Sequence, residues 1–161
     1  MLFVDRLNSR QILHQHILPM LGKHGSVLDV GVRSYTRIHA QILKEYTSVD
    51  IDPQRGADLV ADVTDPSFPE VAGRFRSILF NGMIGFGINN KKSLELSIGN
   101  FFKVINGGVL VIGWNENKMS RLSVSEVVTK IGFKPCLIFR RDIYEPFYSP
   151  EKHYYSMWRR T

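Results

Sequence analysis

Four short apolar runs, separated by stretches with helical periodicity, restrict the fold of this chain more than any other feature. They occupy residues 27–30, 48–51, 77–80 and 109–112, and each is typical of a strand buried inside a sheet. A weaker strand is predicted at residues 58–60. Strands that alternate with helices lie parallel, because each helix returns the chain to the start of the next strand.

The intervening stretches predict helices over residues 8–21 and about 91–105. A further helix carries Ile38, with Ser34 as its expected N-cap. Periodic apolar positions over 124–131 mark the last helix of the chain. The pattern through this point is therefore strand, helix, strand, helix, as in an α/β protein.

The end of the chain follows a different pattern. Residues 136–139 and 154–158 carry two strand signals with no helix between them. We expect an antiparallel pair joined by a long loop over residues 140–153. The predicted fold is a doubly wound, mostly parallel sheet of seven strands, with helices on both faces and an antiparallel strand pair at the C-terminus.

Composition agrees with one globular domain over residues 1–161, because 43% of the residues are hydrophobic and 22% are charged. The single cysteine, Cys136, excludes an internal disulfide. The longest aliphatic run spans only 109–112, whereas a membrane span needs about 20 residues. Residues 1–6 lack the basic-then-apolar order of a signal peptide. We therefore expect a cytoplasmic protein that does not enter the membrane.

The charge is unevenly distributed. The formal net charge is +6, from 21 basic and 15 acidic residues. Acidic residues gather in 50–65 and basic residues in 134–161. A basic segment is typical of nucleic-acid binders, but also of an ordinary solvated surface, so nucleic acid is kept as an alternative partner.

Ligands of such sheets bind where the parallel strands end. Gly31 follows the first strand and lets the backbone approach a ligand closely. Asp50 stands 19 positions further on, near the spacing at which an acid accepts hydrogen bonds from ribose hydroxyls. Asp62 could bind an exocyclic amine, and Val63 offers a backbone N–H. These positions predict a pocket for an adenosine-like ligand, although each acid could instead cap a turn.

Phosphate-binding patterns are missing from these loops. The first turn, residues 31–36, contains one glycine, and no P-loop motif occurs in the chain. The glycine cluster over 82–87 follows the wrong strand for a dinucleotide. Asp29 beside the first turn would repel phosphate and suit a cationic amine. S-adenosylmethionine combines such an amine with a sulfonium and a ribose.

Several segments, in their order and spacing, resemble the motifs of class I S-adenosylmethionine-dependent methyltransferases. Residues 27–31 are similar to the first motif, 48–53 to the second and 57–63 to the third. Residues 101–112 look like the helix, Gly-Gly turn and strand that follow the fourth motif. The likeness covers about residues 20–160 and implies S-adenosylmethionine as cofactor, methyl transfer as the reaction and the same sheet.

The site residues follow from these positions. The expected cofactor-binding residues are Asp29, Gly31, Asp50, Ile51, Asp62, Val63, Asn81 and Gly82. His153 and Tyr148 are the candidate catalytic residues, in a loop that we expect to close over the methyl acceptor. Tyr144 and Trp114 are further candidates to line the acceptor pocket. No metal site is expected, because no acidic cluster follows the fourth strand.

The acceptor is expected to be a small molecule or a sugar, and a second subunit could complete its site, so a homodimer is left open. Arg33 and Tyr35 stand where the family usually has further glycines. A degenerate, non-catalytic protein of the same fold is therefore one alternative. A nucleic-acid methyltransferase is the other, because of the basic C-terminal segment.

Overall fold

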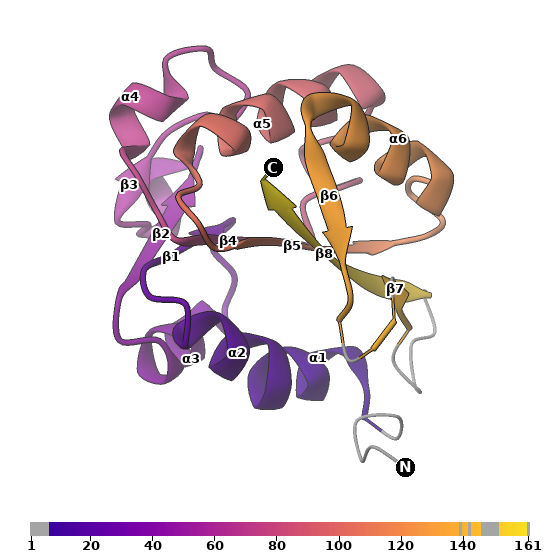
Figure 1. Ribbon diagram of the computed structural model, residues 1–161. Helices are drawn as coiled ribbons and strands as arrows, with labels where there is room; N and C mark the ends of the chain where they lie inside the picture. Colours follow the sequence, from indigo (N-terminus) through magenta and orange to yellow (C-terminus); the bar gives the residue numbers. More distant parts are fainter. Residues whose placement is uncertain (1–6, 139, 142, 146–151, 161) are drawn as a thin grey trace.

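The computed structural model describes residues 7–138, 140–141, 143–145 and 152–160, and in these residues one twisted sheet lies between two layers of helices (Figure 1). Seven strands lie side by side in the order β3-β2-β1-β4-β5-β8-β6, and β7 pairs with β8 off this path. The strands are β1 (Val27–Val30), β2 (Tyr46–Asp50), β3 (Leu59–Val60), β4 (Ser77–Asn81), β5 (Val109–Asn115), β6 (Phe133–Cys136), β7 (Ile143–Tyr144) and β8 (His153–Arg160). The predicted fold class is confirmed.

Strand direction also follows the prediction. The strands β1 to β5 pair in parallel, and β8 runs antiparallel to both β5 and β6. The β5–β8 register extends from Val109 opposite Arg159 to Asn115 opposite His153. The carboxyl ends of five parallel strands and the first residue of β8 therefore meet at one edge of the sheet.

Two details of the C-terminal strands differ from the prediction. The strand β6 covers residues 133–136 instead of 136–139, because Gly132, at a φ of 121°, ends the preceding helix and turns the chain directly into the sheet. Lys134 and Pro135 interrupt the apolar pattern there, and both are tolerated because β6 is the edge strand. His153, predicted in a loop, is the first residue of β8.

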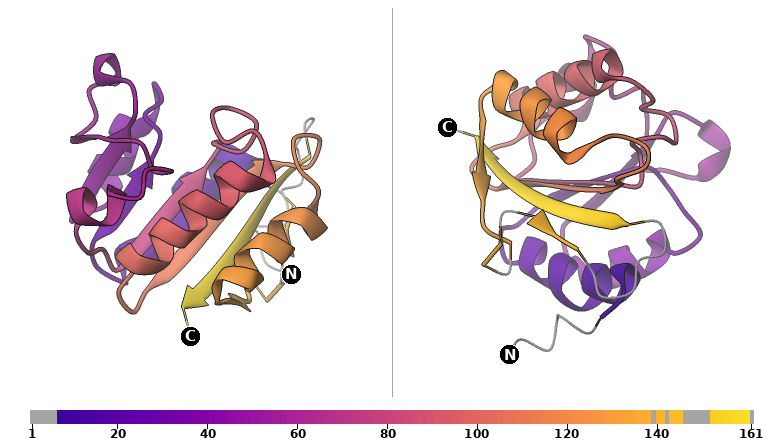
Figure 2. Two further views of the ribbon diagram at one scale, coloured as in Figure 1. Left: turned by 90° about the horizontal axis from the view of Figure 1, so that it is seen from above. Right: turned by 90° about the vertical axis from the view of Figure 1, so that its right-hand side faces the viewer.

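Helices cover both faces of the sheet (Figure 2). One layer consists of α1 (Ser9–Ile12), the π-helical turn η2 (Leu13–Ile17), α2 (Leu18–Gly22) and α3 (Thr36–Ile42). The other consists of α4 (Phe68–Ala72), α5 (Lys91–Val104) and α6 (Arg121–Ile131). The first three segments form one continuous helix, as predicted for 8–21. Its wide π turn precedes Pro19, which has no N–H to donate to the carbonyl four residues earlier.

The helix α3 departs from its predicted cap and inner face. Tyr35, not Ser34, is the N-cap residue, and it makes no side-chain cap hydrogen bond. Ile38 is 42% exposed, whereas His39 is buried. His39 is buried because it makes a polar contact with β1: its Nδ1 lies 2.6 Å from Oδ2 of Asp29. The hydroxyl of Tyr46 donates to the same oxygen at 2.9 Å. A buried carboxylate thus selects a polar inner face for this helix.

Two apolar clusters, one on each face of the sheet, hold the two layers of helices against it. Phe80 and Phe101 belong to the cluster between the sheet and α4, α5 and α6, where their rings meet edge to face with centroids 5.1 Å apart. Leu79 and Val111 point to the opposite face and pack with Ile17 and its neighbours in the N-terminal helices. Both faces of the central strands are buried, which leaves the strand ends as the accessible parts of the sheet.

Replacing Asp29 by Ala should lower the free energy of unfolding by about 3–5 kcal/mol, because His39 and the Tyr46 hydroxyl would lose their buried acceptor. Urea denaturation followed by circular dichroism measures this loss. Asp29→Asn keeps an acceptor oxygen and should lose less. A loss below about 1 kcal/mol in Asp29→Ala would contradict the structural role of this contact.

Candidate functional site

Two cavities open at the carboxyl edge of the parallel strands. The Asp50 cavity, of about 230 Å³, is formed by the ends of β1 and β2, residues 61–64 after β3, and Met83 and Ile88 from the loop after β4. The His153 cavity, of about 310 Å³, is formed by α1, the loop after β1, the ends of β4 and β5, and the start of β8. The predicted site residues divide between these two cavities.

Asp50 presents a carboxylate of fixed orientation in the Asp50 cavity. Its Oδ2 accepts a hydrogen bond of 2.8 Å from the backbone N–H of Val32, and its Oδ1 accepts one of 2.9 Å from that of Asp52. A carboxylate oxygen has two acceptor positions, so each oxygen can accept one more hydrogen bond. The group is therefore suited to a ligand with two adjacent hydroxyls.

Ile51, Asp62 and Val63 complete this cavity. Ile51 is 63% exposed, which places a large apolar side chain at the cavity mouth. Asp62 is held by Thr64, whose backbone N–H and hydroxyl both donate to Oδ1. The amide of Asn100 in α5 fixes the same loop by donating to the carbonyl of Val63 at 2.8 Å. The apolar surface and the two carboxylates suit a nucleoside.

Gly31 lines the Asp50 cavity directly after the end of β1. Its φ is 90°, in the region that favours glycine, and a Cβ at this position would lie 2.5 Å from Sδ of Met83. The side chain of Met83 is thus packed on the glycine. The absence of a side chain at residue 31 leaves the space that the Met83 side chain occupies.

Asp29 lies apart from the other predicted cofactor residues. Its carboxylate is buried beneath α3 with His39 and Tyr46, and it lines neither cavity. Asp29 is close to Gly31 in sequence, but its carboxylate is engaged by His39 and Tyr46 beneath α3, so proximity to the turn does not give it access to either cavity.

Asn81 and Gly82 line the His153 cavity, where the structure brings them together with His153. Nε2 of His153 lies 3.0 Å from Oδ1 of Asn81, and Nδ1 lies 2.7 Å from Oδ1 of Asn115. Gly113 makes room for this arrangement, since a Cβ there would collide with the Asn81 side chain. Tyr148 lies outside the described residues.

Burial lowers the pKa of His153 to about 4, so the imidazole is neutral at pH 7. A neutral imidazole has one N–H and one lone pair. Only one of the two amides can therefore present its oxygen to the ring, and the other turns its NH₂ group toward it. Both ring nitrogens are engaged by Asn81 and Asn115, which fixes the ring at the cavity wall.

The sequence prediction did not identify Arg10 and Asn115 as residues of this cavity. Arg33 was noted only because it stands where the similar family usually has a glycine, and that departure was a signal that its side chain has a role here. All three residues line the cavity. Trp114, a predicted acceptor contact, does not: its indole N–H donates to the carbonyl of Met119 at 3.0 Å, and the ring packs near Tyr154 in the cluster under α5 and α6. The strand β5 points Asn115, not Trp114, into the site.

Two further findings, on membrane-spanning helices and on metal-binding groups, concern only the residues that the structure describes. No helix among them is both long and apolar enough to cross a membrane. No group of three or more His, Cys, Asp or Glu side chains among them is arranged to hold a metal ion.

Comparisons with known proteins identify the fold. No protein-family model matches the chain, and no curated protein sequence does. Among solved structures, the N-methyltransferase NodS from Bradyrhizobium japonicum WM9 is similar, with a TM-score of 0.69 and 16% identity over 94% of this chain and 96% of that one. A TehB-like S-adenosylmethionine-dependent methyltransferase from Corynebacterium glutamicum matches with a TM-score of 0.67 and 16% identity over 94% of both chains.

A third similar structure contains ligands. It is the 1,6-didemethyltoxoflavin-N1-methyltransferase of Burkholderia thailandensis, with bound 1,6-didemethyltoxoflavin and S-adenosylhomocysteine, at a TM-score of 0.68 and 15% identity over 96% of this chain and 79% of that one. The chain therefore has the fold of the class I S-adenosylmethionine-dependent methyltransferases.

The stability of the protein should fall as the pH is lowered from about 6.5 to 4. Unfolded His153 would bind a proton at its usual pKa of 6.5, whereas the folded protein resists this until about pH 4, so the unfolded state takes up more protons in this range. The contribution is on the order of 2–3 kcal/mol. His14, whose pKa burial also lowers, acts in the same direction.

Denaturation of the His153→Gln variant at several pH values measures the share of His153. The variant should show a flatter dependence between pH 4 and 6.5 than the original protein. An unchanged slope would mean that His153 is not buried in neutral form.

Proposed function

We propose that the protein transfers a methyl group from S-adenosylmethionine to a small-molecule acceptor. The observation that carries this proposal is the Asp50 carboxylate, held by two backbone N–H groups at the end of β2 inside a cavity of about 230 Å³. The fold supports the same reaction class, because the similar structures are methyltransferases.

The residues of the Asp50 cavity fit the nucleoside part of this cofactor. Asp50 would accept hydrogen bonds from the two ribose hydroxyls, and Ile51 would cover the adenine ring with its exposed side chain. Asp62 would accept from the exocyclic amine, and Val63 would offer its backbone N–H. These roles make the four residues the adenosine-binding part of the proposed site.

The amino-acid part of the cofactor would extend past Gly31 toward the His153 cavity. Met83 packs against the glycine and lines the Asp50 cavity beside it. A methionine side chain has three rotatable bonds and adapts readily to a new neighbour, so we expect it to move aside when the cofactor enters.

The bound cofactor would supply an electrophilic methyl group on a sulfonium centre. The residues of this chain would orient the acceptor and exclude water, which accounts for a large part of the acceleration of a displacement reaction. His153 is neutral and could accept a proton from the acceptor, provided that Nε2 exchanges its contact with Asn81 for one with the acceptor. Asn81 would then be free to bind the acceptor as well.

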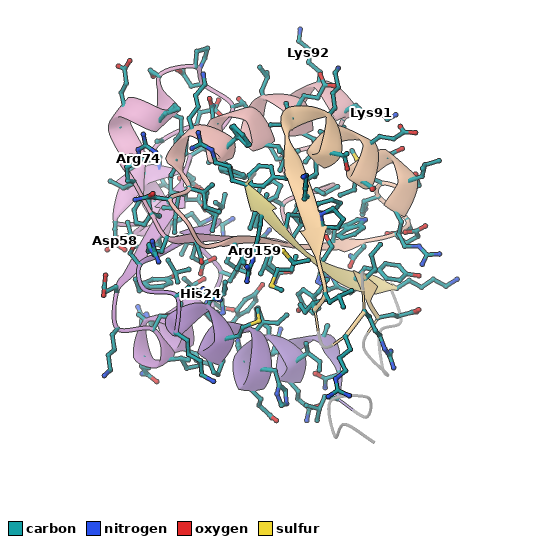
Figure 3. All side chains as sticks on the ribbon, in the orientation of Figure 1. His24, Asp58, Arg74, Lys91, Lys92 and Arg159 are labelled. Atoms are coloured by element: carbon teal, nitrogen blue, oxygen red, sulfur yellow. The ribbon has the colours of Figure 1, made fainter. Side chains whose placement is uncertain are left out.

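Two observations favour a small molecule over nucleic acid as acceptor. The Burkholderia enzyme with a similar fold has a small molecule bound. The basic residues His24, Arg74 and Arg159, labelled in Figure 3, belong to segments at the amino ends of the strands, where Arg159 pairs with the first residue of β5. These three basic residues therefore lie at the amino edge of the sheet, whereas both cavities lie at its carboxyl edge.

A non-catalytic cofactor-binding protein is the second candidate. It is favoured by Arg33 and Tyr35, which replace glycines of the family in the turn beside Gly31, and by the engagement of both nitrogens of His153. Mass spectrometry of the purified protein for an S-adenosyl ligand, followed by methyl-transfer assays on small molecules, separates the two. Bound ligand without turnover would favour this second candidate.

Replacing Asp50 by Ala should weaken S-adenosylhomocysteine binding about 10- to 100-fold, because the ribose hydroxyls would lose an acceptor in a partly buried site. Isothermal titration calorimetry measures the affinity. Asp52→Ala is the matched control, since its carboxylate caps the neighbouring turn at Gln54 and does not line the cavity. Equal affinity of a folded Asp50→Ala variant would exclude the ribose role.

A further inference from the structure

The His153 cavity carries positive charge without a matching negative charge. Arg10 and Arg33 both line it, and within the described residues no Asp or Glu does. Neither guanidinium has a carboxylate partner in that part of the chain. Two cations that line one concave site without a carboxylate partner favour an anionic ligand there.

Both guanidinium groups are held in place by neutral contacts. Arg33 is half-buried, and its Nη2 donates a 2.8 Å hydrogen bond to the carbonyl of Gly82. Its Cζ lies 5.9 Å from the centre of the Phe86 ring. A guanidinium has five N–H donors, so Arg33 keeps most of them for a ligand while its position is already fixed.

Arg10, in α1, also lines the cavity. It is exposed, and its Cζ lies 5.0 Å from the centre of the Tyr35 ring, which is itself part of the lining. The remaining polar lining, from Asn81, Asn115 and the neutral His153, adds no charge. The cavity therefore offers guanidinium forks, amides and aromatic rings, which match a planar anion.

We propose that Arg33 and Arg10 bind a carboxylate in the His153 cavity. The proposal rests on the proposed function for one of its two sources, the carboxylate at the amino-acid end of the cofactor, which would enter past Gly31. The other source is a carboxylate on the methyl acceptor.

Two ligands distinguish these sources. S-adenosylhomocysteine carries the carboxylate, whereas 5′-methylthioadenosine has the same nucleoside without the amino-acid part. If the cofactor is the source, Arg33→Gln should weaken S-adenosylhomocysteine binding at least about tenfold and leave methylthioadenosine binding within about twofold. Arg10→Gln should have a smaller effect in the same direction, because this residue is exposed.

If the acceptor is the source, both adenosine ligands should bind the variants equally. Benzoate should then bind the original protein more tightly than benzamide does, and lose that preference in Arg33→Gln. Amide chemical shifts in NMR titrations detect this weak binding. Arg74→Gln, at the amino edge of the sheet (Figure 3), is the matched control and should behave as the original protein in every titration.

Each remaining outcome has a defined meaning. If neither adenosine ligand binds the original protein, the proposed function fails, and the benzoate comparison alone decides the carboxylate proposal. If Arg33→Gln does not fold, Arg10→Gln decides the same comparisons. Unchanged S-adenosylhomocysteine affinity, together with equal binding of benzoate and benzamide, would overturn the proposal.

Discussion

The antiparallel pairing of β8 with β5 is the interaction on which the rest of the structure depends. It extends over the whole of β5, from Val109 opposite Arg159 to Asn115 opposite His153. Since β8 also pairs with β6 and β7, removing it would separate these two strands from the parallel part of the sheet. The same pairing also shapes the candidate site, because it brings the imidazole of His153 to the ends of β4 and β5.

The two cavities differ in the charge of the residues that line them. The Asp50 cavity is acidic and partly apolar, whereas the His153 cavity is basic and amide-lined. Opposite charges on the two sides give a ligand that spans them a preferred direction, with its hydroxyls toward Asp50 and an anionic group toward Arg33. Gly31 and Met83 are packed together in the wall of the Asp50 cavity, and Gly31 stands two residues before Arg33 in the chain.

The parallel part of the sheet, its antiparallel end and the strand ends that form the candidate site were predictable from the sequence, because the strands show as short runs between helical stretches and the strand ends as polar or glycine residues. Asp50, Asp62 and Gly31 were placed at strand ends for this reason, and they line the Asp50 cavity. Asp29 was misplaced because the acid–histidine contact with His39 joins a strand to a helix and leaves no periodic signal. Arg10 was missed for a similar reason: only the packing of α1 against the sheet brings it to the site.

The two border strands of the sheet bear on how copies of this protein can associate. At one border β3 has two residues, and at the other β6 contains Pro135, which has no N–H to offer a neighbouring strand. Short edge strands and prolines in edge strands discourage edge-to-edge strand pairing between molecules, which leads to aggregation and fibre formation. The geometry of these edge strands favours association of two copies through helical faces or loops over joining of their sheets.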